Sequence, residues 1–195
     1  MFEALNQIDT RLFLFINGQH SPFWDVVMWW ASDKFIWIPL YILVLWFLIK
    51  QNTGKVSLLL LTIVLLVLVS DQCANLSKFI FARLRPSQEP SLEGMIHLLY
   101  YYKGGAFGFY SAHASNAFAV AVFVITLIGK KTKWLIPVLL AYALVVSYSR
   151  IYLGIHYPGD VLAGVLMGSA IGYTTSRIYL RISGSKRKSM QHHNT

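Results

Sequence analysis

The sequence predicts an all-α protein, a polytopic helical bundle that crosses a membrane about five times, or six if an N-terminal segment also spans. Three observations predict this class. Hydrophobic residues make up 56% of the 195 residues, the mean hydropathy is +0.53, and only 13% of residues are charged. Soluble domains are usually less apolar. Helices suit such a chain because they satisfy their backbone hydrogen bonds internally within lipid.

The N-terminal segment, residues 1–31, comes first. Its stretch "LNQIDTRLFLFINGQ" carries apolar and polar residues at roughly helical spacing, and "SPFWDVVMWWA" is rich in aromatic residues. We interpret them as short amphipathic helices on the membrane surface, with a sixth span as the alternative. Because Glu3 and Asp9 stand where a signal peptide needs basic residues, no signal peptide is expected.

Five apolar runs follow, and each is long enough for a span. The first covers residues 35–49, and the second begins at Val56 and continues past Lys78, which is ~33 Å of helix or about one hydrocarbon thickness. The third runs from near His113 to before Gly129, and the fourth covers residues 134–149. The fifth runs from Pro158 to about Ile182, and its "GVLMG" spacing of small residues predicts close approach of another helix.

The net charge of +9 comes from bases that cluster between the apolar runs. In a soluble protein this excess would suggest nucleic acid; here it indicates topology, and no nucleic-acid partner is expected. With five spans, all three clusters fall on one side, which the positive-inside rule makes cytoplasmic. Residues 79–111 and 151–158 then face outward, and residues 186–195 form a basic cytoplasmic tail. The basic clusters are Lys50 and Lys55; Lys130, Lys131 and Lys133; and Arg177, Arg181, Lys186, Arg187 and Lys188.

Three groups of polar residues lie at the outward ends of the spans. In "KFIFARLRP", Lys78 and Arg85 are seven residues apart, so they share a helix face if the helix persists to Pro86. The alternative is a border helix whose bases reach toward the interface. In "FYSAHAS", Ser111 is a good N-cap with His113 in the first turn, and a helix N-terminus suits a phosphate.

The third group is "SRIYLGIHYPGD", with Arg150 at the end of one run, His156 in the turn and Asp160 at the start of the next run. A carboxylate four residues after the histidine could accept from one imidazole nitrogen and leave the other for attack; an ordinary polar turn is the alternative. Taken together, the three groups supply cations, N–H donors, a nucleophile and an acid, which is the set that phosphoryl transfer needs.

These residues resemble the three-part signature of the type 2 phosphatidic acid phosphatase (PAP2) superfamily. The matching residues are Lys78-x6-Arg85-Pro86, Ser111-x-His113 and Ser149-Arg150-x5-His156-x3-Asp160. The second part departs from the family's Pro-Ser-Gly-His, because Tyr110 and Ala112 stand for its proline and glycine. The Cβ of Ala112 narrows the approach of the backbone to a phosphate.

The resemblance implies a role for each matching residue. His156 attacks phosphorus to give a phosphohistidine, Asp160 orients it, and His113 protonates the leaving oxygen. The phosphate oxygens are held by Lys78, Arg85, Ser111, Ala112 and Arg150. No metal and no cofactor is implied. One PAP2-like domain then covers residues 1–185, with residues 79–111 as the outward loop over the site.

Several other polar residues are weighed separately. Asp71 and Asn75 can share a helix face with Lys78. We favour a structural role for Asp71 inside the bundle over a role in substrate entry. Tyr100, Tyr101 and Tyr102 in the loop could rest on the membrane surface. His97 is interpreted as a loop residue, and a metal site at His192 and His193 is not expected.

The predicted function is an integral membrane lipid phosphatase of the bacterial inner membrane, with its site facing the periplasm or outside and its C-terminus in the cytoplasm. Its partners are the bilayer and a lipid phosphate, with no obligate protein partner evident. Undecaprenyl diphosphate is the first substrate choice, followed by lipid A and then by phosphatidylglycerol phosphate or phosphatidate. A lipid phosphotransferase and a non-catalytic lipid-binding protein are the rival interpretations. The single cysteine, Cys73, excludes an internal disulfide.

Overall fold

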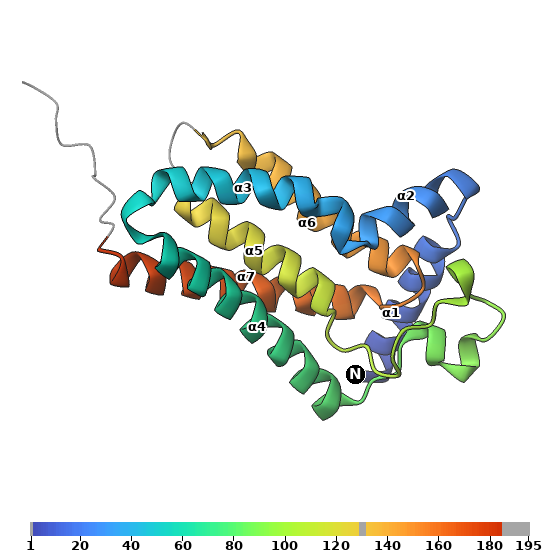
Figure 1. Cartoon of the computed structure of the whole chain (residues 1–195). Helices are drawn as coiled ribbons and strands as arrows, with labels where there is room; N and C mark the ends of the chain where they lie inside the picture. The colour runs from blue at the N-terminus through green and yellow to red at the C-terminus, as the bar shows by residue number, and fades with distance from the viewer. Residues whose placement is uncertain (1, 129–131, 185–195) are drawn as a thin grey trace, which may run out of the picture.

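The structure is a computed structural model that describes residues 2–128 and 132–184 (Figure 1). These residues form α-helices joined by short 3-10 turns, with one isolated β-bridge between Leu84 and Phe107. The predicted all-α class is confirmed. The helices are α1 (Phe2–Asn17), α2 (Pro22–Ser32), α3 (Ile38–Gln51), α4 (Val56–Phe81), α5 (Ala112–Leu127), α6 (Leu135–Tyr152) and α7 (Pro158–Ile182).

Helix α5 forms the centre of the bundle. It packs most extensively on α7 and also contacts α6 and α4. The contact with α7 is close because Gly168 lies against the backbone of Ser115, where a Cβ would come within 2.1 Å of the Ser115 carbonyl oxygen. Gly164 and Gly172 face Ser111 and Ala119 in the same way. The predicted close approach along "GVLMG" is therefore confirmed.

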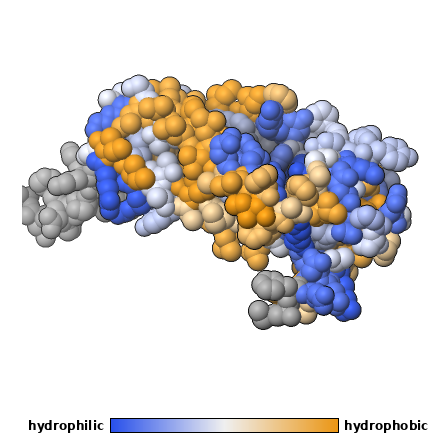
Figure 2. Space-filling model, turned by 90° about the horizontal axis from the view of Figure 1, so that it is seen from below, coloured by the Kyte–Doolittle hydropathy of each residue, from blue (hydrophilic) through white to orange (hydrophobic). Residues whose placement is uncertain are grey.

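Helices α3 to α7 follow the five predicted apolar runs, and three of the five meet the length and apolarity of a span. In the described part of the chain, three segments are long and apolar enough to cross a membrane: Lys34–Gln51, Thr53–Phe81 and Leu135–Tyr152. Ala112–Leu127 is apolar but shorter, and α7 has 25 residues with glycine and polar residues among them. Hydrophobic residues cover much of the face shown in Figure 2, interrupted by a hydrophilic patch near its middle, and hydrophilic residues also gather toward its ends.

The two ends of the bundle differ. The α3–α4 connection and the end of α7 lie together, where the Tyr179 hydroxyl donates to Asn52 Oδ1 at 3.1 Å and Gly184 lies near Lys55 (Figure 1). Helices α1 and α2 and the loop after α4 lie at the other end. This separation agrees with the sequence prediction, although Lys130, Lys131 and residues 186–195 lie outside the described residues.

The N-terminal segment forms two helices of 16 and 11 residues, as the interfacial interpretation predicts. Leu5, Ile8, Leu12 and Phe15 project from α1 with exposed fractions of 46 to 66%, while Phe13 is fully buried against the bundle. One apolar face is therefore free to meet lipid, and the opposite face packs on the protein. Helix α1 also carries Glu3, Asp9 and Arg11 within its 16 residues, and α2 has only 11 residues. The structure therefore favours surface helices over a sixth span.

The end of α4 corrects one prediction. The helix stops at Phe81, and Ala82 adopts a left-handed conformation with φ of 44°. The predicted continuation of the helix to Pro86 is therefore wrong. Arg85 lies beyond the helix and does not share a helix face with Lys78. The chain instead turns back and pairs with residues 106–108, because Arg85 N donates to Ala106 O at 3.0 Å and Gly108 N to Arg83 O at 2.8 Å. This pairing brings Arg85 back toward Lys78.

Candidate active site

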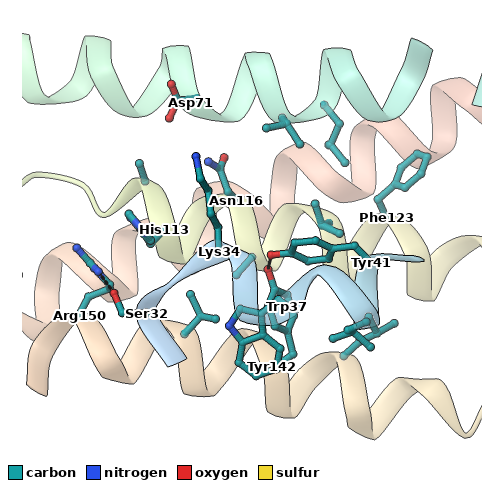
Figure 3. A pocket seen from close by; sticks show the side chains of 18 of the residues that line it. Ser32, Lys34, Trp37, Tyr41, Asp71, His113, Asn116, Phe123, Tyr142 and Arg150 are labelled. Carbon is teal, nitrogen blue, oxygen red and sulfur yellow. Dashed lines mark hydrogen bonds between the residues drawn. The ribbon is translucent and has the colours of Figure 1, made fainter. Parts of the chain in front are cut away.

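A cavity of about 730 Å³ lies between α3, α4, α5 and α6. Six of the eight residues predicted from the sequence line it: Lys78, Arg85, Ala112, His113, Arg150 and His156. Ser111 and Asp160 are buried next to these residues. Figure 3 shows Arg150 and His113 toward one end of the cavity, with Tyr41 and Tyr142 farther along it. The structure thus gathers residues from three separate parts of the sequence.

The turn between α6 and α7 fixes His156 relative to Arg150. The Arg150 carbonyl oxygen accepts from the backbone N–H groups of Ile155 at 3.1 Å and His156 at 3.2 Å. Gly154 makes the reversal possible because its φ is +76°, and a Cβ there would lie 2.7 Å from Leu98. The backbone of the predicted nucleophile is therefore tied to the helix end that carries a predicted phosphate ligand.

Asp160 lies directly behind His156. Its carboxylate is fully buried; Oδ2 accepts from Tyr157 N–H at 3.1 Å and lies 3.6 Å from His156 Nδ1. That distance is slightly longer than a hydrogen bond. Gly108 permits this arrangement, because a Cβ there would lie 3.0 Å from Asp160 Oδ2. A small rotation of the ring would let Nδ1–H donate to Asp160, which leaves the lone pair of Nε2 for attack.

Burial lowers the pKa of His156 to about 4. Asp160 opposes this effect, while the charges of Arg85 and Arg150 add to it. The imidazole is therefore neutral at pH 7, which is the form that a nucleophile needs.

We expect the acidic limb of the kcat/KM profile that belongs to His156 to lie near pH 4 to 5, below the ordinary imidazole value of about 6.5. The neutral form is lost only as the pH falls through the lowered pKa. The profile must be corrected for the substrate phosphate, whose own second pKa is near 6. A limb that stays near 6.5 after this correction would contradict the expected state of His156.

Three cationic side chains in the cavity, those of Lys78, Arg85 and Arg150, could bind an anion. Arg150 is 4% exposed and donates from Nη1 to Ser32 Oγ, and Arg85 Nε donates to Phe107 O at 3.1 Å. Lys78 Nζ donates to Asn75 Oδ1 at 3.3 Å. Among the described residues, none of the three cations has a carboxylate within 4 Å. They form no ion pair with a carboxylate in the described part of the chain, and this arrangement in a cavity favours a phosphate there.

The second predicted group lies where α5 begins. Ser111 is the N-cap, as predicted, but its N–H donates to Asp160 O at 3.0 Å. Its buried Oγ has no partner among the described residues and remains able to donate. His113 follows in the first turn and exposes part of its surface to the cavity. The hydroxyl and the first-turn N–H groups of α5 can therefore meet the same anion as the cations.

Asp71 also lines the cavity (Figure 3). It accepts from Asn75 Nδ2 at 3.2 Å, and Asn75 in turn accepts from Lys78. The predicted shared face of these three residues is confirmed. The carboxylate hydrogen-bonds within its own helix, so it can orient Lys78 through Asn75. It also borders the cavity, so a role in substrate entry stays open.

Arg83 is a residue that the sequence analysis missed. Its Nη1 donates to Asp160 Oδ1 at 2.7 Å, and its Nη2 donates to Asp9 Oδ2 at 2.7 Å and to Asn6 at 2.9 Å. Burial acts against the charge of this guanidinium, but Asp160 and Asp9 outweigh it and raise the pKa of Arg83. Asp9 also accepts from Gly159 N–H at 2.7 Å. Helix α1 is thus bonded to the segment that carries His156 and Asp160.

Comparisons with known proteins agree with this site. The chain matches the PAP2 superfamily over residues 55–183. It is 42% identical over 176 residues to a lipid A 4'-phosphatase of Bacteroides thetaiotaomicron, covering 89% of this chain and 77% of that protein. It is 30% identical over 173 residues to an undecaprenyl-diphosphatase of Sulfolobus acidocaldarius, covering 87% and 78%. The crystal structure of Aquifex aeolicus LpxE superposes with a TM-score of 0.67 at 27% identity, covering 86% of this chain and 94% of that one.

Proposed function

The chain belongs to the PAP2 superfamily and is a membrane lipid phosphatase, and on this premise we propose that its substrate is an acylated lipid phosphate of the lipid A class. The observation that carries this proposal is the cavity itself. Three cations that form no ion pair among the described residues lie with two histidines in one part of it, and the space continues among apolar side chains such as Leu48, Phe123 and Leu139. A lipid that carries a phosphate has this combination of properties.

In the proposed reaction, His156 Nε2 attacks phosphorus and the bond from phosphorus to the lipid oxygen breaks. His113 gives its proton to that oxygen, so the dephosphorylated lipid leaves as an alcohol. Water then attacks the phosphohistidine and gives its proton to His113, which releases inorganic phosphate and restores both imidazoles. Lys78, Arg85, Arg150, Ser111 and the N–H of Ala112 stabilise the charge on the phosphate oxygens.

Polar groups deeper in the cavity support an acylated substrate. The hydroxyls of Tyr41 and Tyr142 lie 2.9 Å apart, so one donates to the other and one O–H is left to donate elsewhere. Asn116 Oδ1 is buried without a partner among the described residues. The ester or amide groups of an acylated lipid offer carbonyl and N–H partners at such positions, whereas a polyprenyl chain offers none.

Undecaprenyl diphosphate is the second candidate, supported by the relative from Sulfolobus acidocaldarius. The sequence alone favoured it over lipid A. We reverse that order because of the higher identity to the lipid A 4'-phosphatase and because of the polar groups in the cavity.

The proposed function is tested with the full chain in detergent, without added metal. Lipid A, phosphatidate, phosphatidylglycerol phosphate and undecaprenyl diphosphate are compared for release of inorganic phosphate, and the lipid products are identified by mass spectrometry. We expect the highest kcat/KM with lipid A. A phosphorylated lipid acceptor in place of free phosphate would indicate a phosphotransferase, and no turnover of any lipid would indicate a binding protein.

We expect Tyr142→Phe to lower kcat/KM for lipid A by roughly 3- to 10-fold, which corresponds to one lost hydrogen bond of about 0.5–1.5 kcal/mol. The same variant should leave kcat/KM for undecaprenyl diphosphate unchanged, because that lipid has no acyl carbonyl. Tyr41→Phe is the matched variant, since it removes the other hydroxyl of the pair. Equal losses for both lipids would show that the pair supports the fold and does not select the substrate.

We also propose that the protein lies in the bacterial inner membrane with this site outward and its C-terminus in the cytoplasm. The support is the separation of the basic connections from the cavity end of the bundle. Labelling an engineered cysteine in the loop 89–105 with a membrane-impermeant reagent in intact spheroplasts tests this orientation. Labelling only after lysis would reverse it.

A further inference from the structure

A second group of ionisable side chains lies outside the cavity, where the α1–α2 connection meets the loop 89–105. It consists of His20, Asp25 and His97. His97 Nε2 lies 2.9 Å from Asp25 Oδ1, and the rings of His20 and His97 stack with centroids 3.7 Å apart. One ligand atom from each side chain lies within 4.8 Å of the others. The proposed phosphatase reaction uses none of the three residues.

Neighbouring side chains hold this group in place. Asn17, which is 1% exposed, donates from Nδ2 to His97 O at 3.0 Å and accepts from His97 N–H at 2.8 Å. The Tyr152 hydroxyl donates to Asp25 Oδ1 at 2.8 Å. Both side-chain bonds to Asp25 among the described residues go to Oδ1, so Oδ2 remains available to a ligand. The bond from Tyr152 to the Asp25 carboxylate is the kind of outer partner that orients a metal ligand.

We propose that His20, Asp25 and His97 bind a divalent transition-metal ion of the zinc type. Imidazole nitrogen and carboxylate oxygen are ligands that Zn²⁺ accepts, at about 2.0–2.2 Å, and water can fill the fourth position. Such distances require ligand atoms ~3.3 Å apart. The exposed His20 side chain can make this adjustment by rotating off the His97 ring, while His97 and Asp25 already lie 2.9 Å apart.

The bound ion would fasten the loop to the N-terminal helices. His97 belongs to the loop whose Tyr102 and Gly105 line the catalytic cavity, and Trp29 of α2 already contacts Tyr100 and Tyr102. Asn17 also donates to Tyr152 O at 2.7 Å, two residues beyond Arg150. The metal would therefore stabilise the loop, and it would take no part in the phosphatase reaction.

Zinc binding by the metal-free full chain, measured by isothermal titration calorimetry in detergent, tests the site. We expect one Zn²⁺ per chain, with affinity at least about tenfold weaker in His20→Ala and in His97→Gln. His20 is exposed, so its replacement does not threaten folding. Zn²⁺ should also raise the Tm of the wild-type chain and not that of His20→Ala, because only a ligand of the folded state stabilises it.

Three of the other four histidines provide the controls, since the chain has six. His156→Ala and the double variant His192→Ala/His193→Ala should bind Zn²⁺ as tightly as the wild type. The proposal is overturned if the wild type binds no Zn²⁺, if His20→Ala and His97→Gln bind it unchanged, or if either control loses the binding. These results do not depend on phosphatase activity, so they are separate from a failure of the proposed function.

Discussion

His156→Ala is expected to lower kcat by at least about 10⁴-fold, the scale of loss when the nucleophile of a covalent mechanism is removed. The methyl group of alanine cannot attack phosphorus. Among the described residues that line the cavity, His113 is the only other histidine, and the proposed mechanism needs it as the acid. Phosphate release from lipid A in detergent measures the effect. The KM should change much less than kcat, because the three cations that hold the phosphate remain.

The control for this prediction is the double variant His192→Ala/His193→Ala, which removes two imidazoles that neither the proposed reaction nor the proposed metal site uses and should retain wild-type kcat. His113→Asn should lower kcat by about 10²- to 10⁴-fold, the contribution typical of one general acid. If His156→Ala kept the turnover of the wild type, His156 could not be the nucleophile. If the wild type itself bound lipid A without turnover, the cavity would serve binding alone.

The sequence predicted those parts of the structure that depend on local pattern. The bounds of α7 agree at both ends with the predicted run from Pro158 to Ile182, because proline favours the first turn and the run is long and mostly apolar. The gathering of Lys78, His113 and His156 in one cavity could also be predicted, because spacing and span direction place their helix ends on one side.

The remaining features depend on tertiary contacts that a one-dimensional pattern does not contain. The left-handed turn at Ala82 moves Arg85 off the helix, and its cause is the pairing of residues 83–85 with residues 106–108. The Tyr41–Tyr142 pair joins residues 101 positions apart. The contact between Arg83 and Asp9 spans 74 positions. Its only sequence signals were an arginine without an assigned role inside "KFIFARLRP" and an aspartate in the amphipathic N-terminal segment.

We expect Arg83→Gln to lower kcat by about 10²-fold with little change in KM. The Asp160 carboxylate is fully buried, and Arg83 is the cation bonded to it at 2.7 Å. Removing one partner of a buried ion pair is strongly unfavourable, typically by about 3–5 kcal/mol, because the other charge loses its compensation. The unpaired carboxylate of Asp160 is expected to move toward other polar partners, away from its position 3.6 Å from His156 Nδ1. The nucleophile then loses its orientation, while the phosphate-binding cations remain in place.

Two matched variants separate a positioning role from a purely structural one. Arg83→Lys keeps the charge but cannot bridge Asp9 and Asp160 with a planar fork, so it should recover part of kcat. Asp9→Asn keeps an acceptor for Arg83 and Gly159, so its loss should be smaller than that of Arg83→Gln. The Tm and the folded fraction of each variant are measured beside kcat. If Arg83→Gln lowered the Tm but kept the wild-type kcat per folded molecule, Arg83 would stabilise the fold without positioning Asp160, because a positioning residue must affect turnover in the folded protein.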